Sequence, residues 1–431
     1  MPTCISILMS LILATSVAQG AELQGTQGLS QPPATAPAAE GAPRELPDVT
    51  VVAQAANAFA FDLYARFRSQ EGNLFLSPAS IHTALTMTYA GAAGQTAEQM
   101  AKVLHLDLPS DRLHSAAGQL GRQLNNPPAF RNRAAYELVV DNALWVQEGY
   151  SLRESFTSLV RHSYDAGINL LDFADPVAAA KTINSHIEQV TQQRIKDLVS
   201  PSLIVPRMTK LVITNAIYFK SPWSQTFARN ETADGDFHLL DGQTVQVPLM
   251  HQVTKTVGYM ETEDFQLVDL PYEGHMLSMT ILLPRKVDGL EALEAGLSAK
   301  QLDKWLSQQQ PTDVDVTLPR FTFTSPFELK QPLTELGMGD AFSLAADFGG
   351  MTDAPDGLFI SEVLHKAFVA VDEQGTEAAA ATAVMMQAGG MMREEPPVVF
   401  HADRPFVFLI RHRPSGAILF LGRLANPKTG S

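Results

Sequence analysis

The order in which two hydrophobic patterns occur along this chain constrains its fold more than any other feature. Apolar residues recur at helical spacing from Val51 to Phe67, and helical spacing returns over residues 178–198. A second helix is expected to begin at Ser77, whose hydroxyl can cap the first turn, with Pro78 at the first helical position. A third helix is expected after Thr96. The first half of the chain is therefore predicted to be mainly helical.

The second half has the pattern of strands. Residues 210–219 are rich in β-branched and aromatic side chains and are apolar on both faces, which predicts a central strand. Further strand-like runs occupy residues 264–271, 276–283, 313–323, 364–371, 405–411 and 417–422. Because helices and strands are segregated along the chain and do not alternate, we predict an α+β fold.

The N-terminal segment differs in character from the rest of the chain. An apolar run over residues 5–14 is too short to cross a bilayer and is followed by small residues, which is typical of a secretory signal peptide. We expect residues 1–20 to be this signal, cleaved after Ala18 or Gly20. Residues 21–47 hold five prolines and no aromatic residue, which predicts a disordered tether. Residues 48–431 are then one domain of an extracytoplasmic protein, either secreted or periplasmic.

Charge and cysteine content exclude several kinds of partner and site. The chain has 46 acidic and 31 basic residues, a net charge of −15, so binding to nucleic acid or an anionic membrane gains nothing electrostatically. The single cysteine, Cys4, lies in the predicted signal peptide, which excludes disulfides and cysteine-based metal sites from the mature chain. The usual hydrolase, zinc-protease and phosphate-loop motifs are absent. We therefore expect no catalytic residue, no metal and no cofactor, and do not expect an enzyme.

Residues 372–397 form the most unusual segment. Glu377–Gln387 is rich in alanine and could form a helix on propensity alone. With alternating residues assigned to opposite faces, one face of a strand holds residues 376, 378, 380, 382, 384 and 386 and carries no charge. Such a strip of small residues could slide between two existing strands, with Gly375 as its pivot. The residues alone leave both interpretations open.

This segment resembles a known family. Residues 371–382 (VDEQGTEAAAAT) resemble the hinge of inhibitory serpins almost residue for residue. Further motifs resemble the same family in the same order, namely residues 73–81 (NLFLSPASI), 215–220 (NAIYFK) with Trp223, 336–338 (LGM) with 346–348 (ADF) and 350–352 (GMT), 401–406 (HADRPF) and 422–427 (GRLANP). The resemblance covers nearly all of residues 48–427.

The serpin resemblance implies a specific fold and function. The fold would have three β-sheets, about nine helices and an exposed reactive-centre loop. The function would be suicide inhibition of a serine protease, in which the protease attacks the loop and forms an acyl-enzyme. The cleaved loop would then insert into the large sheet as a new strand and carry the protease with it.

Roles follow from the resemblance for individual residues. The hinge would consist of Glu373, Gly375, Thr376, Glu377, Ala378, Ala379, Ala380, Ala381 and Thr382. Thr376 would be the first residue to insert. A hydrogen-bonded cluster beneath the opening sheet, called the shutter in this family, would contain Ser77, Ser80, Asn215 and His365, and Trp223 would belong to the breach at the top of the sheet.

The scissile bond lies among Ala388, Gly389, Gly390, Met391, Met392 and Arg393. Counting from Glu373 places it after Gly389, whereas counting back from Pro405 suggests Met391. Neutral residues here favour an elastase- or chymotrypsin-like serine protease as target, and Arg393 would suit a trypsin-like enzyme but lies far from the hinge. A cysteine protease is a further partner to consider. We expect a monomer that binds neither nucleic acid nor membrane.

Three residues depart from the family pattern. Ser221 and Gln193 stand where glycine is common, and His186 stands where tryptophan is common. We expect these differences to affect local packing more than mechanism. The alternative function is a non-inhibitory serpin that acts as a carrier or chaperone, but the usual sign of such a member, a bulky or charged hinge residue, is absent at Thr376.

Overall fold

The computed structural model describes residues 47–428 except 132, 356 and 378–395. These described residues belong to one compact unit. The α-helices of the described residues are α1 (Asp48–Phe67), α2 (Pro78–Tyr89), α3 (Gly94–Val103), α4 (Ser110–Asn125), α5 (Glu154–Tyr164), α6 (Pro176–Val190), α7 (Leu290–Ala295), α8 (Ala299–Ser307) and α9 (Lys330–Leu333). Among the described residues, no helix is both long enough and apolar enough to cross a bilayer.

The strands of the described residues form three sheets. The nine-stranded sheet has the order β1 (Leu74–Leu76), β17 (Ile418–Leu424), β16 (Phe406–His412), β10 (Leu277–Pro284), β9 (Phe265–Pro271), β8 (Thr244–Glu261), β11 (Gln310–Pro319) and β15 (Val398–His401), with β7 (Ala233–His238) paired to β8. The six-stranded sheet has the order β12 (Phe321–Glu328), β13 (Ile360–Asp372), β14 (Gly375–Thr376), β6 (Leu211–Pro222), β4 (Glu137–Gln147) and β5 (Gly167–Leu171). The third sheet pairs β2 (Ala129–Phe130) with β3 (Arg133–Ala134).

The predicted α+β class is confirmed, and the central strand predicted at 210–219 is the fully buried core of β6. Two boundaries were wrong. The single run predicted at 313–323 is divided at Arg320 into β11 and β12, which lie in different sheets. The helix over 178–198 ends at Val190, because Gln192 and Gln193 have φ angles of 51° and 66°, which turn the chain out of the helix.

The predicted cap of α2 was also wrong. Ser77 occupies the capping position, but its hydroxyl accepts no bond from a backbone N–H of the helix. Instead it donates to the carbonyl oxygen of Leu419 at 2.6 Å. Pro78 lies at the first helical position as expected. The hydroxyl of Ser77 therefore ties α2 to β17 and does not stabilise the helix end.

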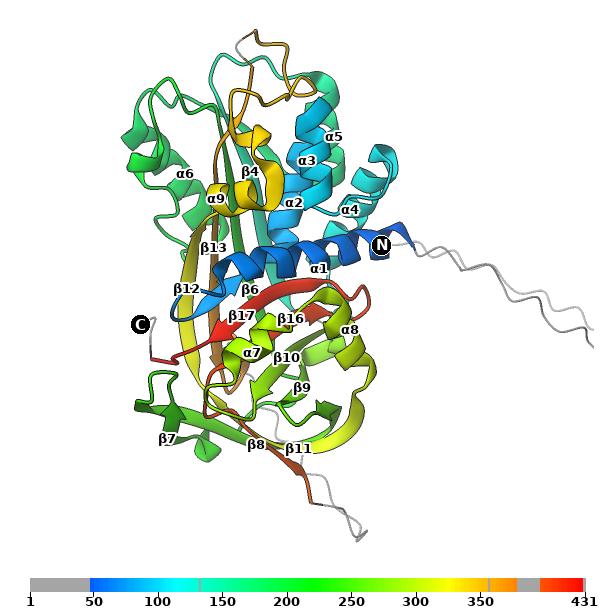
Figure 1. Ribbon diagram of the computed structural model, residues 1–431, viewed down its shortest axis with the longest axis vertical. Helices are drawn as coiled ribbons and strands as arrows, with labels where there is room; N and C mark the ends of the chain where they lie inside the picture. The colour runs from blue at the N-terminus through cyan, green and yellow to red at the C-terminus, as the bar shows by residue number, and fades with distance from the viewer. Residues whose placement is uncertain (1–46, 132, 356, 378–395, 429–431) are drawn as a thin grey trace, which may run out of the picture. The chain divides into compact units, whose positions relative to one another are not determined.

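The two large sheets share a core. Phe219 of β6 packs against Phe420 of β17 at a ring-centroid distance of 5.7 Å, and Phe420 stacks on Phe75 at 4.9 Å. In Figure 1, the long strands β12, β13, β6 and β4 run side by side, and α1 crosses between them and the strands of the nine-stranded sheet. On the other face of the six-stranded sheet, Ile183 and Ile187 of α6 belong to a separate buried cluster with residues of β4, β6 and β13.

Candidate functional site

Two residues of β14 lie between the ends of β13 and β6. Over the first part of their length, β13 and β6 pair directly and in parallel, from Ile360 opposite Leu211 to Ala367 opposite Ile217. Beyond that point β14 separates them, since Thr376 pairs with Val371 on one side and with Ser221 on the other. The predicted hinge thus begins as a short strand within the sheet, antiparallel to both neighbours.

Gly375 is required at the entry to this strand. Its φ of 151° is one that residues with a side chain rarely adopt. A Cβ atom at this position would lie 2.2 Å from the carbonyl oxygen of Ser221 and 2.6 Å from Cα of Pro222. Because both obstacles belong to the backbone, no rotamer change could relieve them.

Thr376 points into the core between the sheets. Its side chain is 1% exposed, and its hydroxyl lies 2.7 Å from the hydroxyl of Tyr272. The ring of Tyr272 stacks on Trp223 at a centroid distance of 4.6 Å. Trp223 holds the hinge from the same side, because its Nε1–H donates to the carbonyl of Asp372 at 3.0 Å and its backbone N–H donates to Gln374 at 2.9 Å. The predicted breach residue therefore contacts the hinge directly.

Glu373 is a buried acid at the start of the hinge. Its carboxylate forms an ion pair with Arg320 and accepts a hydrogen bond from Thr232 Oγ1 at 2.9 Å. Burial acts to raise the pKa of Glu373, but the hydrogen bonds from Arg320 and Thr232 outweigh it and lower the pKa. The carboxylate is therefore charged at neutral pH and fixes the hinge to the loops beside β12 and β7.

The predicted shutter is a row of polar side chains across three strands. Asn142, Asn215 and His365 lie opposite one another on β4, β6 and β13. His365 accepts a bond at Nε2 from the backbone N–H of Ser77 at 3.0 Å, so its Nδ1–H donates to Asn215 Oδ1 at 2.5 Å. The amide of Asn215 then donates to Ser80 Oγ and to Asn142 Oδ1.

The bond between His365 and Asn215 joins β13 and β6, the two strands between which β14 lies. Burial lowers the pKa of His365 to about 3, so the ring is neutral at physiological pH, as its acceptor role at Nε2 requires. The four residues predicted to form the shutter do contact one another, namely Ser77, Ser80, Asn215 and His365. Asn142 was not predicted to join them, because residues 137–147 had not been assigned to a strand.

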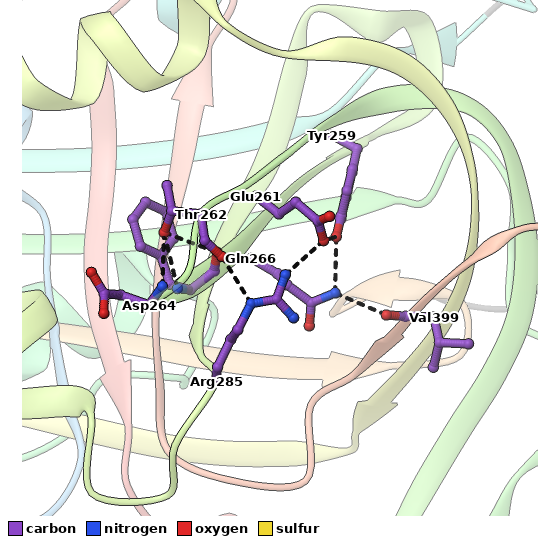
Figure 2. A network of polar contacts seen from close by, with 8 residues as sticks. Tyr259, Glu261, Thr262, Asp264, Gln266, Arg285 and Val399 are labelled. Carbon is purple, nitrogen blue, oxygen red and sulfur yellow. Dashed lines mark hydrogen bonds and ion pairs between the residues drawn. The ribbon is translucent and has the colours of Figure 1, made fainter.

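The segment after the predicted loop is anchored at β15. Within the described part of the chain, this four-residue strand pairs with β11 only, in parallel, from Val398 opposite Val314 to His401 opposite Thr317. Figure 2 shows a second attachment, in which Gln266 Nε2 donates to the carbonyl of Val399 at 2.9 Å. The same amide donates to the hydroxyl of Tyr259, which in turn donates to Glu261.

Part of the predicted site lies outside the described residues. This applies to Ala378, Ala379, Ala380, Ala381 and Thr382 of the hinge and to the scissile-bond candidates Ala388, Gly389, Gly390, Met391, Met392 and Arg393. Glu373, Gly375, Thr376 and Glu377 are described, and all four lie at the junction of β13, β14 and β6.

The three departures from the family pattern have local explanations. Ser221 is buried next to Gly375, and its hydroxyl donates to Ala135 at 3.4 Å. His186 of α6 contacts Asp141 of β4 at 2.9 Å and meets Trp145 edge-on, so it joins the helix to the sheet. Gln193 adopts a left-handed conformation, with φ 66°, in which glycine is least strained.

Comparison with known proteins finds relatives along most of the chain. The family model for serpins, described as serine protease inhibitor, matches residues 54–427. An uncharacterised serpin-like protein of Thermococcus kodakarensis is 43% identical over 380 residues, which cover 88% of this chain and 86% of that protein. The leukocyte elastase inhibitor of Bos taurus is 40% identical over 379 residues, which cover 86% and 97%. The crystal structure of human thyroxine-binding globulin matches with a TM-score of 0.80 and 31% identity, covering 88% of this chain and 99% of that one.

Proposed function

The chain belongs to the serpin family, and on this basis we propose that it inhibits a serine protease by inserting its cleaved loop between β6 and β13. The observation that carries the proposal is the position of β14. Gly375 and Thr376 already pair with both strands, so the hinge occupies the first positions of the added strand. The chain's own residues would perform no catalysis, since the protease supplies the nucleophile.

Each described residue of the hinge contributes to insertion. Gly375 lets the chain pass within contact distance of the β6 backbone, and the small Thr376 enters the core with its hydroxyl satisfied by Tyr272. Addition of further residues would separate β13 from β6 and break the bond between His365 and Asn215. Insertion of residues 376–388 would move the attached protease by about 40 Å, at roughly 3.3 Å per residue.

The basic test is incubation with a panel of purified serine proteases. A covalent complex that survives boiling in SDS is expected with at least one of them. The cleaved protein is expected to melt at a much higher temperature than the intact protein, because one more strand has joined the sheet. Clean cleavage by every protease, with no stable complex and no rise in melting temperature, would reject the proposal.

We propose that the target is an elastase- or chymotrypsin-like protease. The neutral residues Gly389 and Met391 at the two candidate positions support this, and one of the relatives is named as an elastase inhibitor. Mass spectrometry of the C-terminal peptide released by the protease would identify the scissile bond. Cleavage after Arg393 would instead indicate a trypsin-like target. A cysteine protease belongs in the same panel.

A non-inhibitory carrier is the second candidate, because the chain also matches thyroxine-binding globulin over most of its length. The small, buried Thr376 supports the inhibitory alternative, since the hinge of this chain fits the sheet without strain from a bulky side chain. The melting temperature after loop cleavage separates the two functions, as a carrier that cannot insert its loop would show no increase.

We propose that the protein is exported after removal of residues 1–20 and that residues 21–47 are a tether to the serpin domain at 48–431. The apolar run at 5–14 and the proline-rich segment after it support this. N-terminal sequencing of the protein purified from its natural host tests it. A mature chain that still begins with the apolar run would contradict export by this route.

A further inference from the structure

We propose that Arg194 is a positioning residue that holds the hinge in its inserted position by binding Glu377. The inference rests on the proposed function, because it concerns how the loop commits to insertion after cleavage. Arg194 lies in the turn after α6, and Glu377 is the residue that follows β14. The two side chains form an ion pair.

Glu377 makes one further backbone contact with β13, although its φ of 47° turns it out of the extended conformation of β14. Its backbone N–H donates to the carbonyl of Ala370 at 2.8 Å, which extends the pairing of Thr376 with Val371 by one residue. The Glu377 side chain meets Arg194 of the turn after α6, so it lies on the α6 side of the sheet, away from the core that receives Thr376.

Arg194 is held beside β13 and the end of β14, where the loop would enter the sheet. The chain leaves α6 through Gln192 and Gln193, both in left-handed conformations, and the backbone N–H of Arg194 donates to Thr191 at 3.0 Å. The guanidinium lies 6.0 Å from the centroid of the Phe368 ring on β13. Arg194 therefore joins three elements, namely the α6 turn, β13 and the hinge.

The charges around Glu377 make it dependent on Arg194. The Glu377 side chain is 11% exposed, and burial raises its pKa. Arg194, Lys220 and Tyr218 favour the charged form of Glu377 and lower its pKa, whereas Glu137 raises it. Without Arg194, a buried carboxylate would lose its main partner, and the simplest relief is for the hinge to leave the sheet and carry Glu377 into water.

The ion pair is compatible with complete insertion. If Glu377 becomes extended and pairing continues from Thr376 opposite Ser221, Glu377 comes to lie opposite Lys220 on β6. Side chains alternate along a strand, so its carboxylate would stay on the α6 side of the sheet. Arg194 can thus bind Glu377 before and after the rest of the loop enters. Arg194 therefore offsets the burial of the Glu377 carboxylate, and the pair does not need to be broken for insertion to proceed.

The test compares R194Q with E377Q, the double variant R194Q/E377Q and R194K. The matched control is R153Q, which removes the exposed ion pair between Arg153 and Asp353 on another part of the surface. R194Q is expected to raise the number of inhibitor molecules consumed per protease inhibited by roughly tenfold. A larger effect is not expected, because a partly exposed ion pair is worth less than a fully buried one. E377Q, the double variant, R194K and R153Q are expected to stay near the wild type.

A second measurement does not depend on any protease. Hydrogen exchange of the Thr376 and Glu377 amides in the uncleaved protein reports whether the hinge is inserted. Faster exchange is expected in R194Q only, with amides of α1 unchanged as a check on folding. The wild type could fail to inhibit any protease while R194Q still releases the hinge. In that case the proposed function fails and the role of Arg194 stands.

The pH profile gives a readout that general destabilisation would not produce. Because burial raises the pKa of Glu377, lowering the pH neutralises its carboxyl, and the R194Q defect should shrink as the pH falls. Equal hinge exchange in R194Q and the wild type would overturn the proposal. A double variant as defective as R194Q would also overturn it, since the unpaired carboxylate could then not be the cause.

Discussion

Replacement of Thr376 by arginine tests most directly whether the hinge must bury its side chain. Thr376 is 1% exposed, and its hydroxyl bonds with Tyr272 at 2.7 Å in a site closed by Trp223. An arginine there would lose this bond and place a charge in the core. Glu373, the buried acid of the hinge, is already paired with Arg320.

The magnitude follows from two effects. Leaving the buried hydroxyl of Tyr272 without its partner costs about 1–3 kcal/mol. Removing an unpaired guanidinium from water adds several kcal/mol. A conservative total of about 4 kcal/mol, applied to the transition state of insertion, slows that step roughly a thousandfold. Hydrolysis of the acyl-enzyme would then be faster than insertion, and the protein would be cleaved as a substrate.

The assay is the fraction of protease trapped in an SDS-stable complex at equal concentrations of inhibitor and protease. Thr376→Arg is expected to give almost only cleaved product. Thr376→Ser is the matched control, because it keeps the hydroxyl and loses one methyl group, worth about 1 kcal/mol. Complex formation by Thr376→Arg equal to that of the wild type would refute the reasoning that this side chain enters the core.

Three further predictions concern residues close to the insertion path. Gly375→Ala should expel the hinge, because the new Cβ would meet Ser221 at 2.2 Å, and hydrogen exchange at residues 375–377 should accelerate. Gln193→Gly should stabilise the intact protein by about 0.5–1 kcal/mol in urea unfolding, because it relieves a left-handed conformation. The hydrogen bond to Asp141 raises the pKa of His186, so this pair stabilises the folded state at low pH and is lost as the pH rises through that pKa. Asp141→Asn should therefore destabilise the protein more at pH 5 than at pH 8 in thermal melts.

Each of these predictions has a result that would contradict it. An unchanged exchange rate in Gly375→Ala would mean that the hinge does not pass so close to β6. A loss of stability in Gln193→Gly would show that the Gln193 side chain makes a contribution larger than its backbone strain. Equal destabilisation by Asp141→Asn at both pH values would show that His186 is not charged in the folded protein.

Much of the fold could be predicted from periodicity. The helix at 51–67, the central strand at 210–219 and the late strands at 264–283 and 405–422 follow from residue patterns that depend on local geometry alone. β4 was missed, because its residues 137–142 are half-buried and mix polar with apolar side chains. The boundary between β11 and β12 was missed too, because consecutive strands in different sheets leave an unbroken apolar pattern.

The candidate site was predictable where its chemistry is local. The need for glycine at residue 375, the small size of Thr376 and the two faces of the strip beginning there can all be read from neighbouring residues. The contact partners of these residues cannot be read from neighbouring residues. Ser77 was expected to cap a helix, a role that depends on nearby backbone, but it binds Leu419, which is distant in the sequence.

By itself, the sequence determined the class of fold and the family, and it predicted a hinge suited to enter a sheet. Those properties depend on residue size, charge and spacing, which the chain carries without being folded. Only the tertiary structure decided which strands the hinge separates, that Asn142 completes the polar row with His365, and that Arg194 binds Glu377. His365 and Asn215 lie 150 positions apart, and local periodicity carries no information about which distant strands become neighbours. Packing of the two sheets and α6 sets those contacts, because each apolar face must be covered by another element.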